Sequence, residues 1–407
     1  MSISVSIVGL TFLILIHEAG HFFVARAVGM RPRRFYLFFP PAVVKRERNG
    51  IEYGIGAIPL GGYVKIPGMH RPASGDLDAH TGPAREQAPW LEREHEPVRR
   101  ALEEERLDDA RAALGHVREA VGRADLTDGA RRSAERGIAD LDDALSDDAY
   151  WRAKAWKKIA VIFAGPATNL VFAVALLAAV FMIGVPANVS RTVENVVGDS
   201  PALEAGLQPG DTIVAIDGRR VTGETISEAI RASDGEPITL TVVREGRPTE
   251  LEPARPLRTE GVYRLGFELR PTYESFGPVE SVELAFRDIW RVTEATGSAL
   301  ARLVTGDSRD EISSPVGIVQ GSSEALDFSV TVYLRILALI SLSLAILNLL
   351  PLLPLDGGHI AFSVIEAVRG RAIPRVAYER FSLVGIALVL FLFFIGLSND
   401  VNRLNGG

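Results

Sequence analysis

Residues 3–28 read ISVSIVGLTFLILIHEAGHFFVARAV, an apolar run interrupted by one short polar cluster. A bilayer core about 30 Å thick needs roughly 20 mostly apolar residues in a helix, and this run is long enough. It lacks the basic start and the small-residue cleavage site of a secretory signal peptide. We therefore interpret it as a transmembrane helix that is retained.

Three more runs of this kind occur in the 407-residue chain, at residues 159–185, 333–355 and 381–397. The sequence thus predicts a polytopic α-helical membrane protein with four transmembrane helices, in agreement with a mean hydropathy of +0.16. The absence of cysteine excludes disulfides, thiolate metal sites and cysteine nucleophiles. The net charge of −7 argues against a nucleic-acid partner, which would require a basic face.

Lysines and arginines gather on one side of the predicted spans. They follow the first span, precede the second and lie between the third and the fourth. Because such residues mark the cytoplasmic side, we expect both termini and residues 186–332 to lie outside. The first and third spans then run in the same direction.

The polar cluster of the first span is His17-Glu18-Ala19-Gly20-His21. On a helix the two histidines lie one turn apart on the same face, where their imidazole nitrogens can bind one zinc ion. Glu18 lies about 100° round the helix from His17 and can reach a water on the metal. The cluster could instead only pack helices together, but ionisable groups within a span are costly unless they face one another, a cavity or an ion.

A catalytic zinc ion needs a third protein ligand and an open position. Residues 348–359, at the end of the third span, read NLLPLLPLDGGH and offer Asp356. If the first and third spans are parallel, Asp356 lies at a depth similar to that of His17. Asp356 could instead cap the next helix, because Asp-Gly-Gly favours a turn, and His359 is a rival ligand.

Two regions outside the spans are predicted on the outer side. Residues 190–270 alternate short strands with turns, and the sequence AGLQPGD at residues 205–211 resembles a turn of PDZ domains; a small barrel of another kind is the alternative. A PDZ domain binds an extended peptide at a sheet edge. Residues 271–331 include a stretch with helical periodicity and are expected to form an extracytoplasmic helical region.

Two more regions are predicted on the cytoplasmic side. Within residues 31–70, the segment 51–65 shows β-type alternation broken by glycines and is too apolar for an ordinary loop. We predict a re-entrant β-hairpin, whose backbone protein or water must satisfy at membrane depth. Residues 71–150 hold 20 acidic and 12 basic residues, a net charge of −8. They predict a helical hairpin, at 94–120 and 130–145, whose charges form a solvated face.

Together these motifs resemble the site-2 proteases, which are zinc intramembrane metalloproteases of the bacterial regulated-proteolysis branch. The resemblance rests on the His-Glu-x-x-His cluster, on Asn-x-x-Pro-x-x-Pro-x-Asp-Gly from Asn348 to Gly357, and on Gly-Pro-Ala-Thr-Asn at residues 165–169. A single outward PDZ-like domain fits the same branch, whereas the acidic insert has no counterpart in the family pattern.

The resemblance implies a zinc cofactor and a lipid-embedded site toward the cytoplasmic side of a bacterial-type inner membrane. Its substrates would be single-span membrane proteins, such as anti-sigma factors or remnant signal peptides. Glu18 would be the catalytic base, and the implied zinc ligands are His17, His21 and Asp356. The implied substrate-binding residues are Asn348, Asn169, Gly61, Gly62 and Tyr63, although Asn169 could equally serve helix packing.

The expected transmembrane segments are residues 1–30, 157–186, 332–358 and 378–398, and the regions between them are 31–70, 71–150, 190–270 and 271–331. Two functions from other classes remain open at this point. A non-catalytic membrane scaffold that presents the PDZ-like domain would use the polar cluster only for packing. A metal transporter would bind its cargo there, but such proteins often contain paired repeats, and the sequence has no visible internal repeat.

Overall fold

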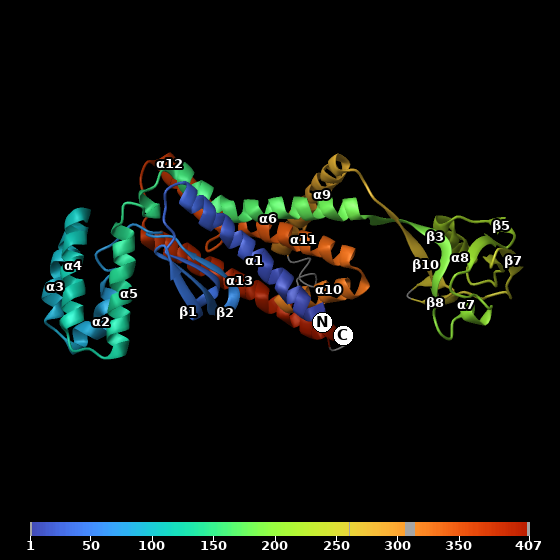
Figure 1. The fold of residues 1–407 in the computed structure, drawn as a ribbon, viewed down its shortest axis with the longest axis horizontal. Helices are drawn as coiled ribbons and strands as arrows, with labels where there is room; N and C mark the ends of the chain where they lie inside the picture. Colours follow the sequence, from blue (N-terminus) through green and yellow to red (C-terminus); the bar gives the residue numbers. More distant parts are fainter. Residues whose placement is uncertain (1, 260, 306–313, 405–407) are drawn as a thin grey trace. The chain divides into compact units, whose positions relative to one another are not determined.

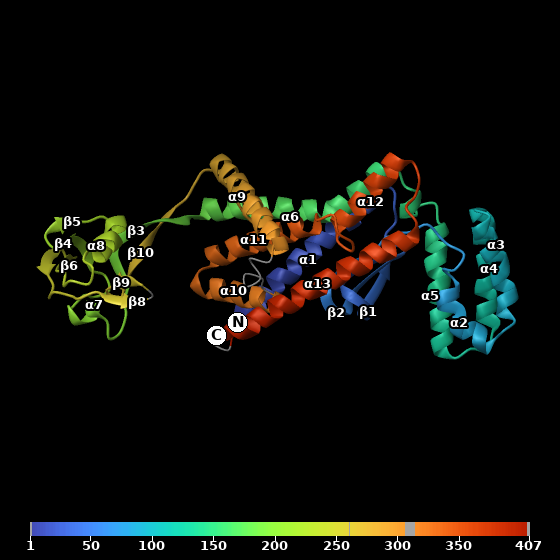
Figure 2. The same ribbon diagram turned by 180° about the vertical axis from the view of Figure 1, so that it is seen from behind.

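The computed structural model describes residues 2–259, 261–305 and 314–404 (Figures 1 and 2). The chain forms two compact units, one made of residues 1–176 and 286–407 and the other of residues 177–285. The first unit contains the long apolar helices, and the second is rich in β-strands.

Four helices are long and apolar enough to cross a membrane, which confirms the number of spans predicted. They are α1 (Ser2–Ala27), α6 (Ala155–Ile183), α11 (Val330–Asn348) and α13 (Arg375–Leu404). The prediction was wrong about the third span, because α11 ends at Asn348 and does not continue to residue 355. Pro351 and Pro354 follow, and proline cannot donate the hydrogen bond that a continuing helix requires. A separate helix, α12 (Asp356–Arg369), then begins.

Helices α1 and α11 run in the same direction, as predicted. Near the start of both, the Tyr333 hydroxyl donates a hydrogen bond of 3.2 Å to the main-chain oxygen of Val5. Farther along both, Leu13 and Leu337 belong to one apolar cluster. This parallel arrangement allows the end of α11 to approach the polar cluster of α1.

The helix α10 (Pro315–Phe328) connects the ends of the first and last spans. It packs against α1, and a carboxylate of α13 caps its first turn. Oδ2 of Asp400 accepts hydrogen bonds from the main-chain N–H groups of Ser314, at 2.8 Å, and Gly317, at 3.0 Å. The start of α1 and the end of α13 therefore lie close together, as Figures 1 and 2 both show.

The segment 51–65 pairs with a strand that the sequence analysis did not predict. The strands β1 (Arg34–Arg48) and β2 (Ile51–Lys65) are joined by Asn49 and Gly50, which both have positive φ angles, as tight hairpin turns require. The predicted hairpin within 51–65 is thus one arm of a larger sheet. Residues 34–37 pair with 52–55 on one side and with 62–65 on the other. In the part of the chain that the structure describes, residues 62–65 have no second strand beside them and form a free edge.

The acidic insert contains four helices instead of the predicted two. They are α2 (Asp78–Gln87), α3 (Leu91–Glu103), α4 (Leu107–Arg123) and α5 (Asp128–Leu145), followed by the short helix η1 (Tyr150–Arg152). The segment 94–120 is broken at Glu105, whose φ angle of 57° no helix can contain. The four helices share an apolar core of their own.

Ion pairs join this four-helix insert to the sheet of β1 and β2. Arg33 lies 2.8 Å from Asp143 and 3.1 Å from Asp148, and Lys65, the last residue of β2, lies 2.6 Å from Asp140. Salt bridges lower the pKa of Asp148, although burial acts to raise it. Some charges of the insert therefore form ion pairs with residues at the sheet. The prediction had described the charges of the insert only as a solvated face.

The second unit is the predicted β-rich region. Its six-stranded sheet has the order β10-β3-β4-β6-β7, with β5 beside β4. The strands of this sheet are β3 (Val185–Val196), β4 (Thr212–Ile216), β5 (Arg219–Arg220), β6 (Leu240–Arg244), β7 (Arg247–Glu250) and β10 (Phe267–Glu274). A separate two-stranded sheet is formed by β8 (Leu257–Thr259) and β9 (Val262–Arg264). The unit also contains two short helices, α7 (Pro201–Glu204) and α8 (Gly223–Ala232). They are capped by Ser200 and Thr222, whose side chains accept hydrogen bonds from main-chain N–H groups of the first turn.

The predicted helical region after this sheet contains α9 (Pro278–Thr305). One part of the predicted apolar face is buried, since Ala285 is fully covered and Ile289 is 9% exposed. Another part is open, since Phe286 is 57% exposed.

Candidate metal centre

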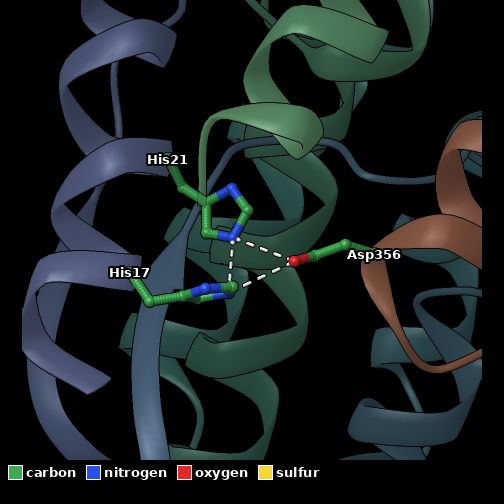
Figure 3. Close-up of side chains that lie close together, drawn as sticks. All are labelled: His17, His21 and Asp356. Carbon is green, nitrogen blue, oxygen red and sulfur yellow. Dashed lines mark hydrogen bonds and ion pairs between the residues drawn. The ribbon is translucent and has the colours of Figure 1, made fainter. Parts of the chain in front are cut away.

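His17 and His21 project from the same face of α1, as their spacing predicts (Figure 3). Each residue is only 7% exposed, and their Nε2 atoms lie 3.2 Å apart. Because the two Nε2 atoms are so close, a third group can contact both of them at once.

That third group is Asp356, the first residue of α12. Its Oδ2 atom lies 3.2 Å from Nε2 of His17 and 3.5 Å from Nε2 of His21. The backbone brings it there because Gly357 fits directly against the main-chain oxygens of Leu349 and Leu350, where any side chain would overlap them. Asp356, Gly357 and Gly358 form the first turn of α12, whose N-cap is Leu355. Asp356 therefore does not cap this helix, as the alternative interpretation would have it, but approaches the two histidines.

The three groups fit a metal ion. Their ligand atoms all lie within 4.8 Å of one another. Asp356 supplies the carboxylate among them. Its buried Oδ2 has no hydrogen-bond donor among the described residues. Three converging lone pairs repel one another unless a cation lies between them, and two imidazoles with one carboxylate form a typical ligand set for zinc.

Helix α6 lies against the back of both histidines. His21 Nδ1 is 2.8 Å from the main-chain oxygen of Val161. A carbonyl oxygen can only accept, so His21 carries its proton on Nδ1 and keeps the lone pair of Nε2 free. One turn along α6, a side chain on Gly165 would overlap Nε2 of His21 and come within 2.8 Å of Nε2 of His17. Gly20 of α1 in turn has no room for a side chain beside the Ala164 main-chain oxygen.

Sequence reasoning missed Val161 and the role of Gly165. The sequence Gly-Pro-Ala-Thr-Asn at residues 165–169 was noted, but only Asn169 was assigned a role. Gly165, one turn before Asn169, is the one glycine of α6, and this is the signal that could have indicated a close helix contact.

Asn169 lies apart from the other predicted substrate-binding residues. Its side chain is 0% exposed and approaches Nδ1 of His17 at 3.3 Å. It therefore offers no surface to a substrate.

Glu18 opens onto a cavity of about 580 Å³ beside the two histidines and Asp356. The other predicted site residues line the same cavity, and they are Gly61, Gly62, Tyr63, Asn348 and His359. His359 does not belong to the group of three ligand atoms found among the described residues. Burial lowers the pKa of His359, so its imidazole is neutral at pH 7. A carboxylate and a neutral imidazole thus face an open space next to the metal position.

The free edge of β2 passes directly over Glu18. A side chain on Gly62 would overlap Cγ of Glu18, so only the bare backbone of this strand fits there. Gly61, with a φ angle of 143°, adopts a conformation that favours glycine. The edge residues 62–65 and the carboxylate of Glu18 therefore border the same cavity.

The sequence matches known proteins over almost its whole length. Residues 5–392 match the model of peptidase family M50. A Rhizobium meliloti protein that is named as a zinc metalloprotease is 30% identical over 98% of this chain and 95% of its own length. The regulator of sigma-E protease RseP of Escherichia coli is 28% identical over 98% of both chains. The protease RseP of Yersinia pestis is 28% identical over 99% of both chains.

Proposed function

This chain belongs to peptidase family M50 and is a zinc metalloprotease of the bacterial inner membrane, and from that premise we propose that it cleaves peptide bonds within the transmembrane segments of single-span proteins. The proposed zinc ligands are His17, His21 and Asp356. The observation that carries the proposal is the convergence of these three groups beside the cavity of Glu18, at a helix that is long and apolar enough to span a membrane.

In the proposed mechanism the chain's own residues bind the substrate and move protons. A bound zinc ion supplies a Lewis acid that activates water and polarises the scissile carbonyl. Glu18 accepts a proton from the attacking water and delivers it to the leaving amine. Asn348 lines the cavity from the end of α11 and donates a hydrogen bond to the substrate near the scissile bond. The family of the chain thus favours catalysis over a non-catalytic scaffold or a transporter.

We also propose that the substrate pairs with the free edge of β2. A transmembrane helix must unwind before its backbone can be cut, and lipid offers no hydrogen bonds to an unwound segment. Residues 62–65 can supply them by strand addition, with Gly61, Gly62 and Tyr63 next to the catalytic base. Val43 and Val44, on the opposite arm of the sheet, are 68% and 62% exposed, which supports membrane re-entry of this sheet.

The distribution of Lys and Arg supports an orientation with the cavity toward the cytoplasm and residues 190–270, the PDZ-like domain, outside. In this orientation the substrate's outer domain meets the PDZ-like domain. We propose single-span substrates such as anti-sigma factors or remnant signal peptides, and no nucleic-acid partner.

The ligand assignment predicts different results for Asp356 and His359. In the purified full-length protein, Asp356→Asn is expected to lower the zinc content and to abolish cleavage of a single-span substrate, because it removes the anionic ligand. His359→Ala is expected to leave the zinc content unchanged. Metal analysis of both variants beside the wild type measures this, and the opposite pattern would assign the third ligand to His359.

The PDZ-like domain is expected to act as a size filter. Replacing residues 198–265 by a short linker leaves β3 and β10, which pair with each other, in place. This variant should cleave a full-length substrate with a bulky outer domain that the wild type leaves uncut. A substrate already shortened on the outer side should be cleaved by both. If the full-length substrate remains uncut by the variant, the filter proposal fails and peptide binding becomes the better explanation.

A further inference from the structure

The two histidines present their Nε2 atoms to Asp356, so their Nδ1 atoms face away from it, toward α6. The main-chain oxygen of Val161 accepts a hydrogen bond from Nδ1–H of His21. Asn169 lies eight residues later on α6 and occupies the corresponding place beside Nδ1 of His17, at 3.3 Å. Gly165 lies midway between them, so one face of α6 contacts both imidazoles.

We propose that Asn169 is a positioning residue, which accepts a hydrogen bond from Nδ1–H of His17 and thereby holds His17 in the tautomer that binds zinc through Nε2. This inference rests on the zinc ligands proposed above. It gives His17 the same kind of partner that Val161 gives His21. Such second partners fix the tautomer and the ring orientation of a metal-binding histidine.

The orientation of the Asn169 amide follows from the metal. With Nδ2 toward His17, Nδ1 of His17 must accept, and its proton must sit on Nε2, between Asp356 and His21. In that orientation Oδ1 of Asn169 is buried with no hydrogen-bond partner among the described residues. A half-turn of the amide keeps its shape and places Oδ1 against Nδ1 of His17. Only this second orientation leaves Nε2 with a free lone pair.

The surroundings of Asn169 match a positioning role. Its side chain is fully buried, so the low local dielectric strengthens its hydrogen bond to His17. Ser341 of α11 donates a hydrogen bond of 2.9 Å to the main-chain oxygen of Asn169. Asn169 therefore links α6 to both helices that approach the site, and its side chain acts on the substrate only through His17.

Zinc affinity, measured by competition with a chelator, tests this role independently of proteolysis. Asn169→Leu, which keeps the size of the side chain but not its acceptor, is expected to weaken zinc binding about 10–100-fold. Asn169→Ala should do the same and decides the question if the leucine variant does not fold. Asn169→Asp, whose carboxylate can accept the same hydrogen bond, should restore affinity close to that of the wild type. Ser341→Ala is the matched control, because it alters packing at Asn169 but leaves the side-chain amide in place.

Two results would overturn the inference: wild-type zinc affinity in both Asn169→Leu and Asn169→Ala, or an Asn169→Asp variant that binds zinc as weakly as Asn169→Leu. His17→Ala separates this failure from a failure of the proposed ligand set. If His17→Ala keeps its zinc, the ligand set itself is wrong. If His17→Ala loses zinc while the Asn169 variants keep it, only the role of Asn169 is wrong.

Discussion

Replacing Glu18 with glutamine is expected to reduce peptide-bond cleavage by about 10²–10⁴-fold, the usual contribution of a positioned acid–base group. Glutamine has nearly the same size and fits below the backbone of Gly62, so the variant should fold normally. Because Glu18 lies outside the group of converging ligand atoms, the zinc content should stay at the wild-type level. The measurement is the initial rate of cleavage of a single-span substrate in detergent or bilayer discs, beside metal analysis of the same preparation.

The combination of results for Glu18→Gln is informative. Lost cleavage with retained zinc supports the role of the carboxylate as the base. Undiminished cleavage would rule out that role and leave His359, the neutral imidazole in the same cavity, as the next candidate. Loss of zinc together with activity would mean that Glu18 helps to hold the metal.

Gly165→Ala is expected to act by a different route, through the binding of zinc. The added methyl group would occupy the space of the imidazole nitrogen of His21 and crowd that of His17. Gly20 of α1 already lies against the main chain at Ala164 of α6, so a shift of α6 away from the histidines would break this close helix contact. The histidines must therefore leave their ligand positions, and zinc affinity should fall by at least about 10–100-fold, as when a supporting partner is lost.

A glycine in an open environment provides the control for this variant. Gly297, within helix α9, has no atom within 4 Å of the position that a side chain would take. Gly297→Ala should leave zinc affinity unchanged and favour its helix slightly, by roughly 1 kcal/mol. A Gly165→Ala protein that binds zinc as tightly as the wild type would show that α6 does not confine the two histidines.

The parts of the site that depend on local sequence were predictable. His17 and His21 share one helical turn, so their common face follows from the helical period alone. The proximity of Asp356 followed from the direction of two spans, which the basic residues indicated. The role of Gly165 could not be predicted in this way, because α6 is apolar on all sides and its pattern does not reveal which face meets α1.

The regions between the spans were harder to predict for a related reason. Segment 51–65 carries a clear β pattern, but its partner strand, residues 34–48, contains Pro40 and Pro41, which argue against a strand. In the insert, residues 103–106 read Glu-Glu-Glu-Arg, and both residue types favour helices, so the local sequence gives no sign of the break at Glu105. The backbone conformation at Glu105 and the packing of four helices on one core decide the fold of this region.

The bare glycine backbone over Glu18 has a consequence for selectivity. If substrates join the edge of β2 as proposed, residues 61 and 62 contact them through amide and carbonyl groups, which every amino acid possesses. Recognition at this point then depends on how readily a polypeptide unwinds from a helix. It depends little on which residues flank the scissile bond. Cleavage positions in unrelated targets should accordingly share weak helical propensity and lack a common consensus.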